Sequence, residues 1–201
     1  MALNFAVNNS LSAVTALPAS ISGGGLNLIS TQTASSSSTI SFTSGIDSTY
    51  KEYIFKFNNV HPATSDASFT FNTSVDGGSN YNVTKTTTTP RAYHDEADSE
   101  AAIEYDGGQD LAQSTSFQGI SRFLGNGNDE CGSGTLHIFD PSSTTFVKHF
   151  IAVANTYYSG DYSFNDFTAG YGNTTSAVNA VQFKMSSGNI DSGTIKMYGV
   201  T

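Results

Sequence analysis

Charged residues, cysteine and proline are all scarce in this chain. Asp, Glu, Lys and Arg account for 12% of its 201 residues, whereas globular domains usually carry about 25%. Cys131 is the single cysteine, so no disulfide can form within the chain, and stability must come from packing or from oligomerisation. No stretch approaches the roughly 20 apolar residues of a transmembrane helix.

Basic residues are the scarcest charged group. The chain has 8 Lys and Arg against 17 Asp and Glu, which gives a net charge of −9. An acidic chain repels phosphate backbones and anionic lipid surfaces, so we expect neither a nucleic-acid partner nor a membrane partner. Residues 1–5 lack the basic segment that begins a secretory signal peptide, and we expect a protein made and folded in a cytoplasm.

Aromatic and hydroxyl-bearing residues are what the chain has in quantity. It contains 14 Phe and 10 Tyr, although hydrophobic residues are only 37% of the total. Aromatic side chains bury a large area each, so they can support a core and argue against disorder. The length fits one large β-domain, and Ser, Thr and Asn suit exposed strand faces.

Residues 38–88 carry the clearest strand signals. Between residues 50 and 60, and again between 68 and 75, aromatic side chains occupy alternate positions, which is the period of a strand. Residues 76–79 contain two adjacent glycines, and a further β-type run follows at 81–88. A strand, a glycine turn and a second strand together predict a β-hairpin over this segment.

The remaining strands are expected at intervals typical of hairpins. Residues 99–105 fit either a short helix or a strand, and we favour the strand because the surroundings are all β. The other expected strands are 26–29, 114–124, 134–139, 177–185 and 194–200. In total, eight to ten strands predict an antiparallel, jelly-roll-like β-sandwich over residues 26–201, preceded by an extended N-terminal arm at 1–25.

The run at 145–154 is the most hydrophobic in the chain. Its two faces are both apolar, with Phe146, Phe150 and Ala152 on one and Val147, Ile151 and Val153 on the other. Strands that are apolar on both faces are usually covered on both faces. We therefore expect a central strand buried on both sides.

Catalytic signals are weak. His94 with Asp95 and Asp98 could be part of a triad, but no Gly-x-Ser-x-Gly sequence supplies a nucleophile. The acidic stretch 95–110 offers paired carboxylates, Glu104 and Asp106, as a glycosidase needs. Any acidic loop could supply such a pair, and we favour a solvated acidic face as the explanation. We expect no catalytic residues, and a glycan-cleaving enzyme is the less favoured alternative.

Cofactor signals are weak as well. Oxygen-bearing side chains that Ca²⁺ could use occur at Asp95, Asp98, Asn126, Asn128 and Asp129. Their order does not follow a calcium-binding loop. We therefore expect no metal and no cofactor, with Ca²⁺ as a side possibility.

Two groups of residues are candidates for binding. The segment 157–171 is expected to be a long loop whose rings could stack on sugars or contact a protein, unless they only cap the core. Its candidate residues are Tyr157, Tyr158, Tyr162, Phe164, Phe167 and Tyr171. The arm is expected to order against a neighbouring subunit through Leu3, Phe5, Val7, Leu11, Val14 and Leu17.

Several stretches resemble uncharacterised structural proteins of tailed bacteriophages, those of marine phages above all. The resemblance lies in residues 28–35, 40–50, 53–57, 61–64, 74–79, 183–190 and 193–199. It spans most of residues 26–201 and carries no catalytic residues.

The resemblance implies a virion protein assembled in the host cytoplasm, either a surface decoration or a subunit associated with a tail or fibre. Such subunits usually form homo-oligomers, often trimers. Other virion proteins would be its partners. A host surface glycan would be a ligand if the protein is instead a carbohydrate-binding, receptor-recognising module.

Overall fold

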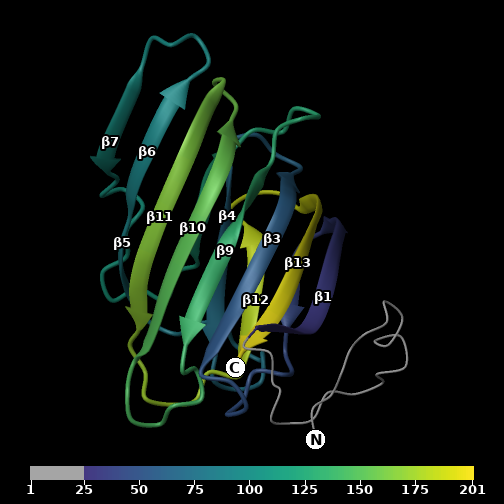
Figure 1. The fold of residues 1–201 in the computed structure, drawn as a ribbon, viewed down its shortest axis with the longest axis vertical. Coiled ribbons are helices and arrows are strands. Elements are labelled where there is room, and N and C mark those ends of the chain that lie inside the picture. Colours follow the sequence, from purple (N-terminus) through teal and green to yellow (C-terminus); the bar gives the residue numbers. More distant parts are fainter. Residues whose placement is uncertain (1–24) are drawn as a thin grey trace, which may run out of the picture.

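The computed structural model describes residues 25–201, which fold into thirteen β-strands (Figure 1). The strands are β1 (Leu26–Ser37), β2 (Ile40–Phe42), β3 (Glu52–Pro62), β4 (Ala67–Ser74), β5 (Lys85–Thr88), β6 (Pro90–Asp95), β7 (Ala101–Tyr105), β8 (Gln118–Leu124), β9 (Gly132–Phe139), β10 (Lys148–Tyr158), β11 (Tyr162–Gly172), β12 (Ala180–Met185) and β13 (Ile190–Val200). Within this range there is no helix long and apolar enough to cross a membrane.

The strands pair antiparallel in two layers. The large layer runs β1-β13-β3-β9-β10-β11; β11 then pairs with both β5 and β6, and β7 pairs with β6. The small layer runs β8-β4-β12-β2, and a single bridge between Tyr158 and Leu124 joins it to β10. The chain passes repeatedly from one layer to the other, as in a jelly roll. The predicted antiparallel β-sandwich is confirmed.

The core lies between the layers and is built mainly from phenylalanine. Phe69 of β4 stacks on Phe183 of β12 with ring centroids 5.3 Å apart, and Phe71 meets Phe150 of β10 edge to face at 5.0 Å. Every residue of β4 is buried, because β8 and β12 flank it and the large layer covers it. Aromatic packing thus compensates for the modest hydrophobic content.

The predicted hairpin over residues 68–88 is wrong. Gly77 and Gly78 do form a left-handed turn, with φ of 73° and 90°. Both edges of β4 are already paired with β8 and β12, however, so the chain crosses to the large layer and β5 pairs with β11. A turn signal fixes where a strand ends, but it does not fix which strand comes alongside.

Other sequence predictions have mixed outcomes. The strand favoured for residues 99–105 is confirmed as β7. The first strand is longer than expected, because β1 extends through the serine-rich stretch to Ser37. The expected loop at 157–171 is wrong: β10 and β11 form a long hairpin that turns at residues 159–161, where Asp161 has φ of 63°.

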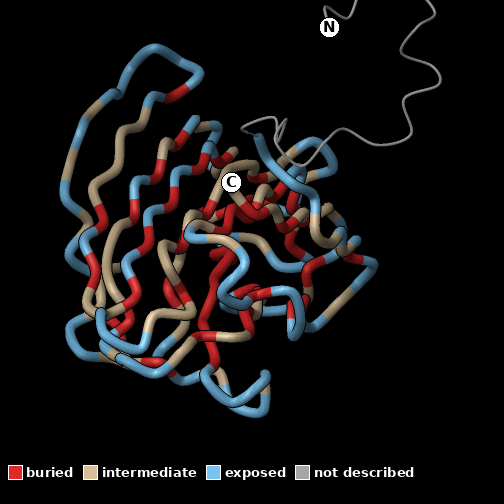
Figure 2. Tube along the Cα trace, turned by 60° about the horizontal axis from the view of Figure 1, so that its bottom comes forward, coloured by how far each residue is buried: buried red, intermediate tan, exposed pale blue. Residues whose placement is uncertain are grey.

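The expectation that 145–154 is covered on both faces is also wrong. Along β10 buried and exposed residues alternate strictly from Lys148 to Thr156 (Figure 2). Phe150, Ala152 and Ala154 face the core, whereas Ile151 is 47% exposed and Val153 is 37% exposed on the outer side of the large layer. No other described segment covers this outer face.

Candidate functional site

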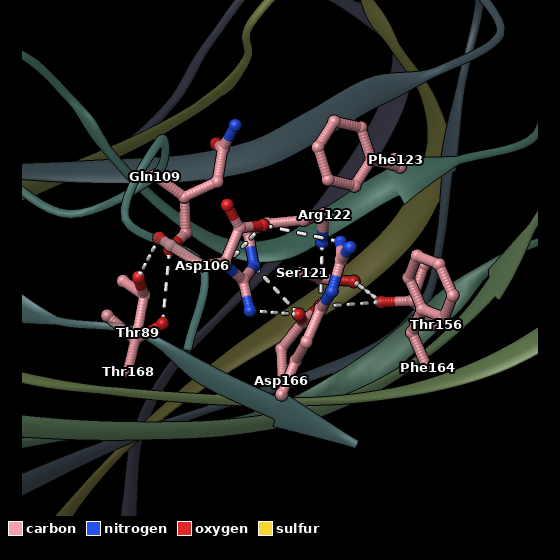
Figure 3. A network of polar contacts seen from close by, with 12 residues as sticks. Thr89, Asp106, Gln109, Ser121, Arg122, Phe123, Thr156, Phe164, Asp166 and Thr168 are labelled. Carbon is pink, nitrogen blue, oxygen red and sulfur yellow. Dashed lines mark hydrogen bonds and ion pairs between the residues drawn. The ribbon is translucent and has the colours of Figure 1, made fainter. Parts of the chain in front are cut away.

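A polar network links the two layers near the end of the β10–β11 hairpin (Figure 3). Five side chains alternate in charge along it: Glu104, Arg91, Asp106, Arg122 and Asp166. Arg91 Nη2 lies 2.6 Å from Glu104, and Asp106 Oδ2 lies 3.3 Å from both Arg91 Nη1 and Arg122 Nη1. Arg122 Nη2 and Asp166 Oδ1 are 2.6 Å apart.

The inner end of this network is fully buried. The side chains of Arg122, on β8, and Asp166, on β11, have no solvent exposure. Asp166 also accepts a hydrogen bond from the Arg122 backbone N–H at 2.9 Å and another from Thr156 Oγ1 at 3.4 Å. Burial raises the pKa of Asp166, and Arg122 acts in the opposite direction by stabilising the carboxylate. The pair therefore fixes β8 of the small layer against β11 of the large layer.

The outer end of the network is aromatic. The Arg91 guanidinium lies 5.0 Å from the ring centroid of Phe164, 5.6 Å from Tyr93 and 5.7 Å from Phe123. These distances are typical of cation–π contacts. Three rings and two carboxylates thus hold Arg91 in one orientation, with its side chain still 19% exposed.

Phe123 reaches this position because β8 contains a bulge. Against β4, Ala67 pairs with Leu124 but Phe69 pairs with Ser121, so β8 carries one extra residue at Arg122 and Phe123. Phe123 has φ of 58°, a left-handed conformation that is strained for a bulky residue. The bulge allows Arg122 to be buried while Phe123, its neighbour, remains partly exposed.

These groups surround a surface pocket of about 310 Å³, lined by Arg91, Asp106, Phe123, Tyr158 and Phe164. This volume is at the lower end of the range of small-molecule sites, about 300–1,000 Å³. Tyr158 stacks on Phe164 with centroids 5.0 Å apart and an interplanar angle of 17°. Asp106 Oδ2 is shared by the two arginines, whereas its Oδ1 receives no hydrogen bond from residues 25–201.

The predicted binding residues divide between the two faces of the hairpin. Tyr158, Tyr162 and Phe164 gather on the inner side, beside the pocket. Tyr162 donates a hydrogen bond to Glu100 at 2.8 Å, and this bond together with burial raises its pKa to about 12. Tyr157, Phe167 and Tyr171 lie on the outer face, because strand neighbours alternate in direction.

Sequence reasoning missed Arg91, Arg122 and Phe123. The residues around an arginine in the sequence do not show whether it will be buried. Arg122 is buried with Asp166, which lies 44 positions away in the chain. The alternation of side chains along the hairpin was the one available signal. In two extended strands, Tyr158, Tyr162 and Phe164 share one face, and Tyr157, Phe167 and Tyr171 share the other.

A shallow groove follows the outer face of β10 and β11. One part, about 460 Å³, is lined by Phe139, His149, Ile151 and Tyr171 among others. It shares Phe139 and His149 with a second hollow of similar volume that reaches Phe146. It also shares Ile151 with a third that reaches Phe167. We call this continuous surface, from Phe146 to Phe167, the outer-face groove.

The strand pair β10–β11, which forms the middle of the outer-face groove, presents no formal charge on its outward side, although Asp140 lines the groove near Phe146. The outward side chains of β10 are His149, Ile151, Val153, Asn155 and Tyr157, and those of β11 are Ser163, Asn165, Phe167, Ala169 and Tyr171. None of them is Asp, Glu, Lys or Arg.

The other predicted sites do not come together as sites. His94 Nε2 and Asp98 Oδ1 lie 3.1 Å apart at the surface, within hydrogen-bonding distance, and Asp95 accepts backbone hydrogen bonds from Ser99 and Glu100 in the β6–β7 turn. Among residues 25–201, no three His, Cys, Asp or Glu side chains are placed to hold a metal ion. The six residues of the expected assembly arm lie outside the described residues.

Two lysines are buried at the opposite end of the hairpin. Lys85 donates hydrogen bonds to Asn72 Oδ1 at 2.6 Å and to the Val83 carbonyl at 2.9 Å. No carboxylate pairs with it among the described residues, and burial lowers its pKa to about 7. Lys148 is bonded to the carbonyls of Phe146 and Thr174, and burial lowers its pKa too.

Comparison of the chain with protein-family models, with curated proteins and with solved structures found no match.

Proposed function

We propose that this protein is a non-catalytic structural subunit that assembles with further copies of itself through the outer-face groove, as part of a bacteriophage virion. The observation that carries the proposal is the exposure of Ile151, Val153 and Phe167 on a strand pair whose outward side bears no charge. Uncharged, partly apolar patches of this kind are typical of interface cores.

The sequence of β10 supports the same conclusion. Its residues have the two-faced apolar pattern of a strand that is covered on both sides. Residues 25–201 cover only the inner side of this strand. A second copy laid against the outer face would supply the missing cover and remove Ile151 and Val153 from water.

The charge distribution favours a second copy in particular. Each chain carries a net charge of −9, so two copies repel one another over most of their surfaces. The outer face of β10 and β11 is a region where two acidic copies can meet without bringing carboxylates together. Burying an unpaired charge in such a contact would be costly.

The virion part of the proposal rests on the resemblance of residues 26–201 to structural proteins of tailed bacteriophages. A hydroxyl-rich, disulfide-free surface suits a subunit that folds in a host cytoplasm and then faces water. Mass spectrometry and cryo-electron microscopy of purified particles would test it. Hundreds of copies indicate a decoration, a few dozen or fewer at one vertex indicate a tail or fibre, and absence from particles contradicts a virion role.

Assembly through the groove can be tested with two matched valines. Val153 lies on the outward side of β10, directly opposite Phe167 of the outer-face groove, and Val75 lies beyond the end of β4; their exposures are 37% and 38%. Sedimentation velocity on the full chain should show an oligomer for the unmodified protein and for Val75→Lys, but monomer for Val153→Lys. A monomeric unmodified protein at every accessible concentration, or equal effects of both substitutions, would contradict the proposal.

A further inference from the structure

We propose that the pocket formed by Arg91, Asp106, Phe123, Tyr158 and Phe164 is a binding site for an uncharged saccharide. The site is distinct from the outer-face groove, because its residues lie on the inner side of β6, β10 and β11, on β8, and just after the end of β7. It adds ligand recognition to a subunit whose assembly uses the opposite face of the same hairpin.

The pocket is large enough for a small ligand, and its lining contains both aromatic rings and hydrogen-bonding groups. Phe123 and Tyr158, with ring centroids 6.3 Å apart, are both partly exposed and offer apolar faces. The C–H face of a pyranose ring packs on such surfaces, while its hydroxyls require donors and acceptors nearby. Arg91 supplies donors, and Asp106 Oδ1 is an acceptor to which no described residue donates.

These polar groups are positioned before any ligand arrives. Arg91 is held by Glu104 at 2.6 Å and by three rings, and Asp106 is held through Oδ2 by Arg91 and Arg122. Arg122 is itself fixed by the buried Asp166. Because these side chains are already ordered, a ligand loses little affinity to ordering them.

The local charge determines the ligand class. The network contains three carboxylates, those of Glu104, Asp106 and Asp166, against the two guanidinium groups of Arg91 and Arg122. Glu100, which binds the Tyr93 and Tyr162 hydroxyls, adds a further negative charge beside the pocket. A phosphate, uronate or sialate would face repulsion here, whereas neutral hydroxyls would not.

The same network argues for binding over cleavage. A glycosidase needs one carboxylic acid that can donate a proton to the glycosidic oxygen. Glu104 and Asp106 are both paired with the Arg91 guanidinium, at 2.6 Å and 3.3 Å, so each carboxylate is already engaged by a cation. The strained bulge at Phe123 supports a functional pocket independently, because such backbone outliers gather at ligand sites.

The proposal can be tested by screening the purified full chain on an array of neutral and acidic oligosaccharides. We expect binding to neutral members and none to those in which every sugar is charged. The best neutral member would then be titrated by calorimetry against Tyr158→Ala and Tyr157→Ala. These residues are neighbours on one strand with opposite directions. Tyr158→Ala should weaken binding at least about tenfold, and Tyr157→Ala should leave it unchanged.

Arg91→Lys keeps the positive charge but loses the fork that reaches Glu104 and Asp106, and it should also weaken binding. Thermal unfolding of each variant would identify any that fails to fold, and a failed Tyr158→Ala would be replaced by Tyr158→Leu. Absence of any binding to the array, binding to acidic members alone, or equal losses for Tyr157→Ala and Tyr158→Ala would overturn the proposal.

Discussion

Lys85 is a residue whose pKa changes markedly because it is buried in the fold. Its ammonium group lies within the fold, bonded only to an amide oxygen and a carbonyl oxygen. Because burial disfavours the charged form, the pKa of Lys85 falls from 10.5 to about 7 in the folded state. Between about pH 7 and pH 10.5, Lys85 is therefore protonated in the unfolded chain but largely deprotonated in the folded chain.

This difference predicts a pH-dependent stability that belongs to one side chain. The free energy of unfolding rises with pH wherever the unfolded chain binds more protons than the folded chain. The contribution of Lys85 to this free energy should therefore rise from about pH 7 upward, by at most about 1.4 kcal/mol per pH unit. In Lys85→Met this rise should be missing. Urea unfolding of both proteins at pH 6.5 and pH 9 would measure it.

The matched control for this measurement is Lys51, whose side chain is exposed and pairs with Asp140 at the surface. Lys51→Met should change the free energy of unfolding equally at the two pH values. If Lys85→Met and Lys51→Met behave alike, Lys85 is not titrating in this range.

At the scale of elements, β9 shows how closely strands approach in the large layer. Gly134 of β9 lies between Phe57 of β3 and Ala154 of β10. A Cβ at this position would lie 2.7 Å from Ala154 Cα and 2.8 Å from Phe57 Cζ, which is closer than packed atoms allow. The glycine is needed here for space.

We therefore expect Gly134→Ala to lower the free energy of unfolding by about 1–3 kcal/mol, because the overpacked strands must shift. Gly108, in the turn after β7, is a suitable control, because the nearest atom to an added Cβ there is 3.6 Å away. Gly108→Ala should be nearly neutral in chemical denaturation. Equal losses for both would mean that backbone freedom, and not space, is what Gly134 provides.

At the scale of the whole molecule, three features hold the two layers together: the phenylalanine core, one β-bridge and a buried ion pair. The phenylalanine core does most of this along the length of the sandwich. At the hairpin end, backbone pairing between β10 and β8 is limited to the bridge between Tyr158 and Leu124. The buried pair of Arg122 and Asp166 joins the layers at the same end.

Removing one partner of this pair should be more damaging than removing both. Arg122→Met leaves the Asp166 carboxylate buried without its countercharge, and we expect a loss of about 3–5 kcal/mol in urea unfolding. The double variant Arg122→Met/Asp166→Leu has no buried charge and should recover much of that loss. A double variant no better than the single one would show that the network, and not charge burial, sets the cost.

The sequence by itself determined the all-β class and the location of most strands. Alternating apolar residues in segments such as 50–60 and 177–185 indicate a strand with one buried face. This pattern is the same whichever strand lies alongside, so it can be recognised without knowing the partner. The acidic balance and the lack of disulfides were likewise fixed by composition. The Gly77–Gly78 turn was identifiable because only glycine readily adopts those backbone angles.

Only the tertiary structure decided which strands are neighbours and where the candidate sites lie. Backbone hydrogen bonds are the same whatever the partner, so β4 could be paired with β8 and β12 in place of β5 without any local signal. Arg122 is buried because Asp166 arrives opposite it from a distant strand. Likewise, Ile151 and Val153 look like core residues in sequence, and their exposure follows from the absence of a third layer in the described fold.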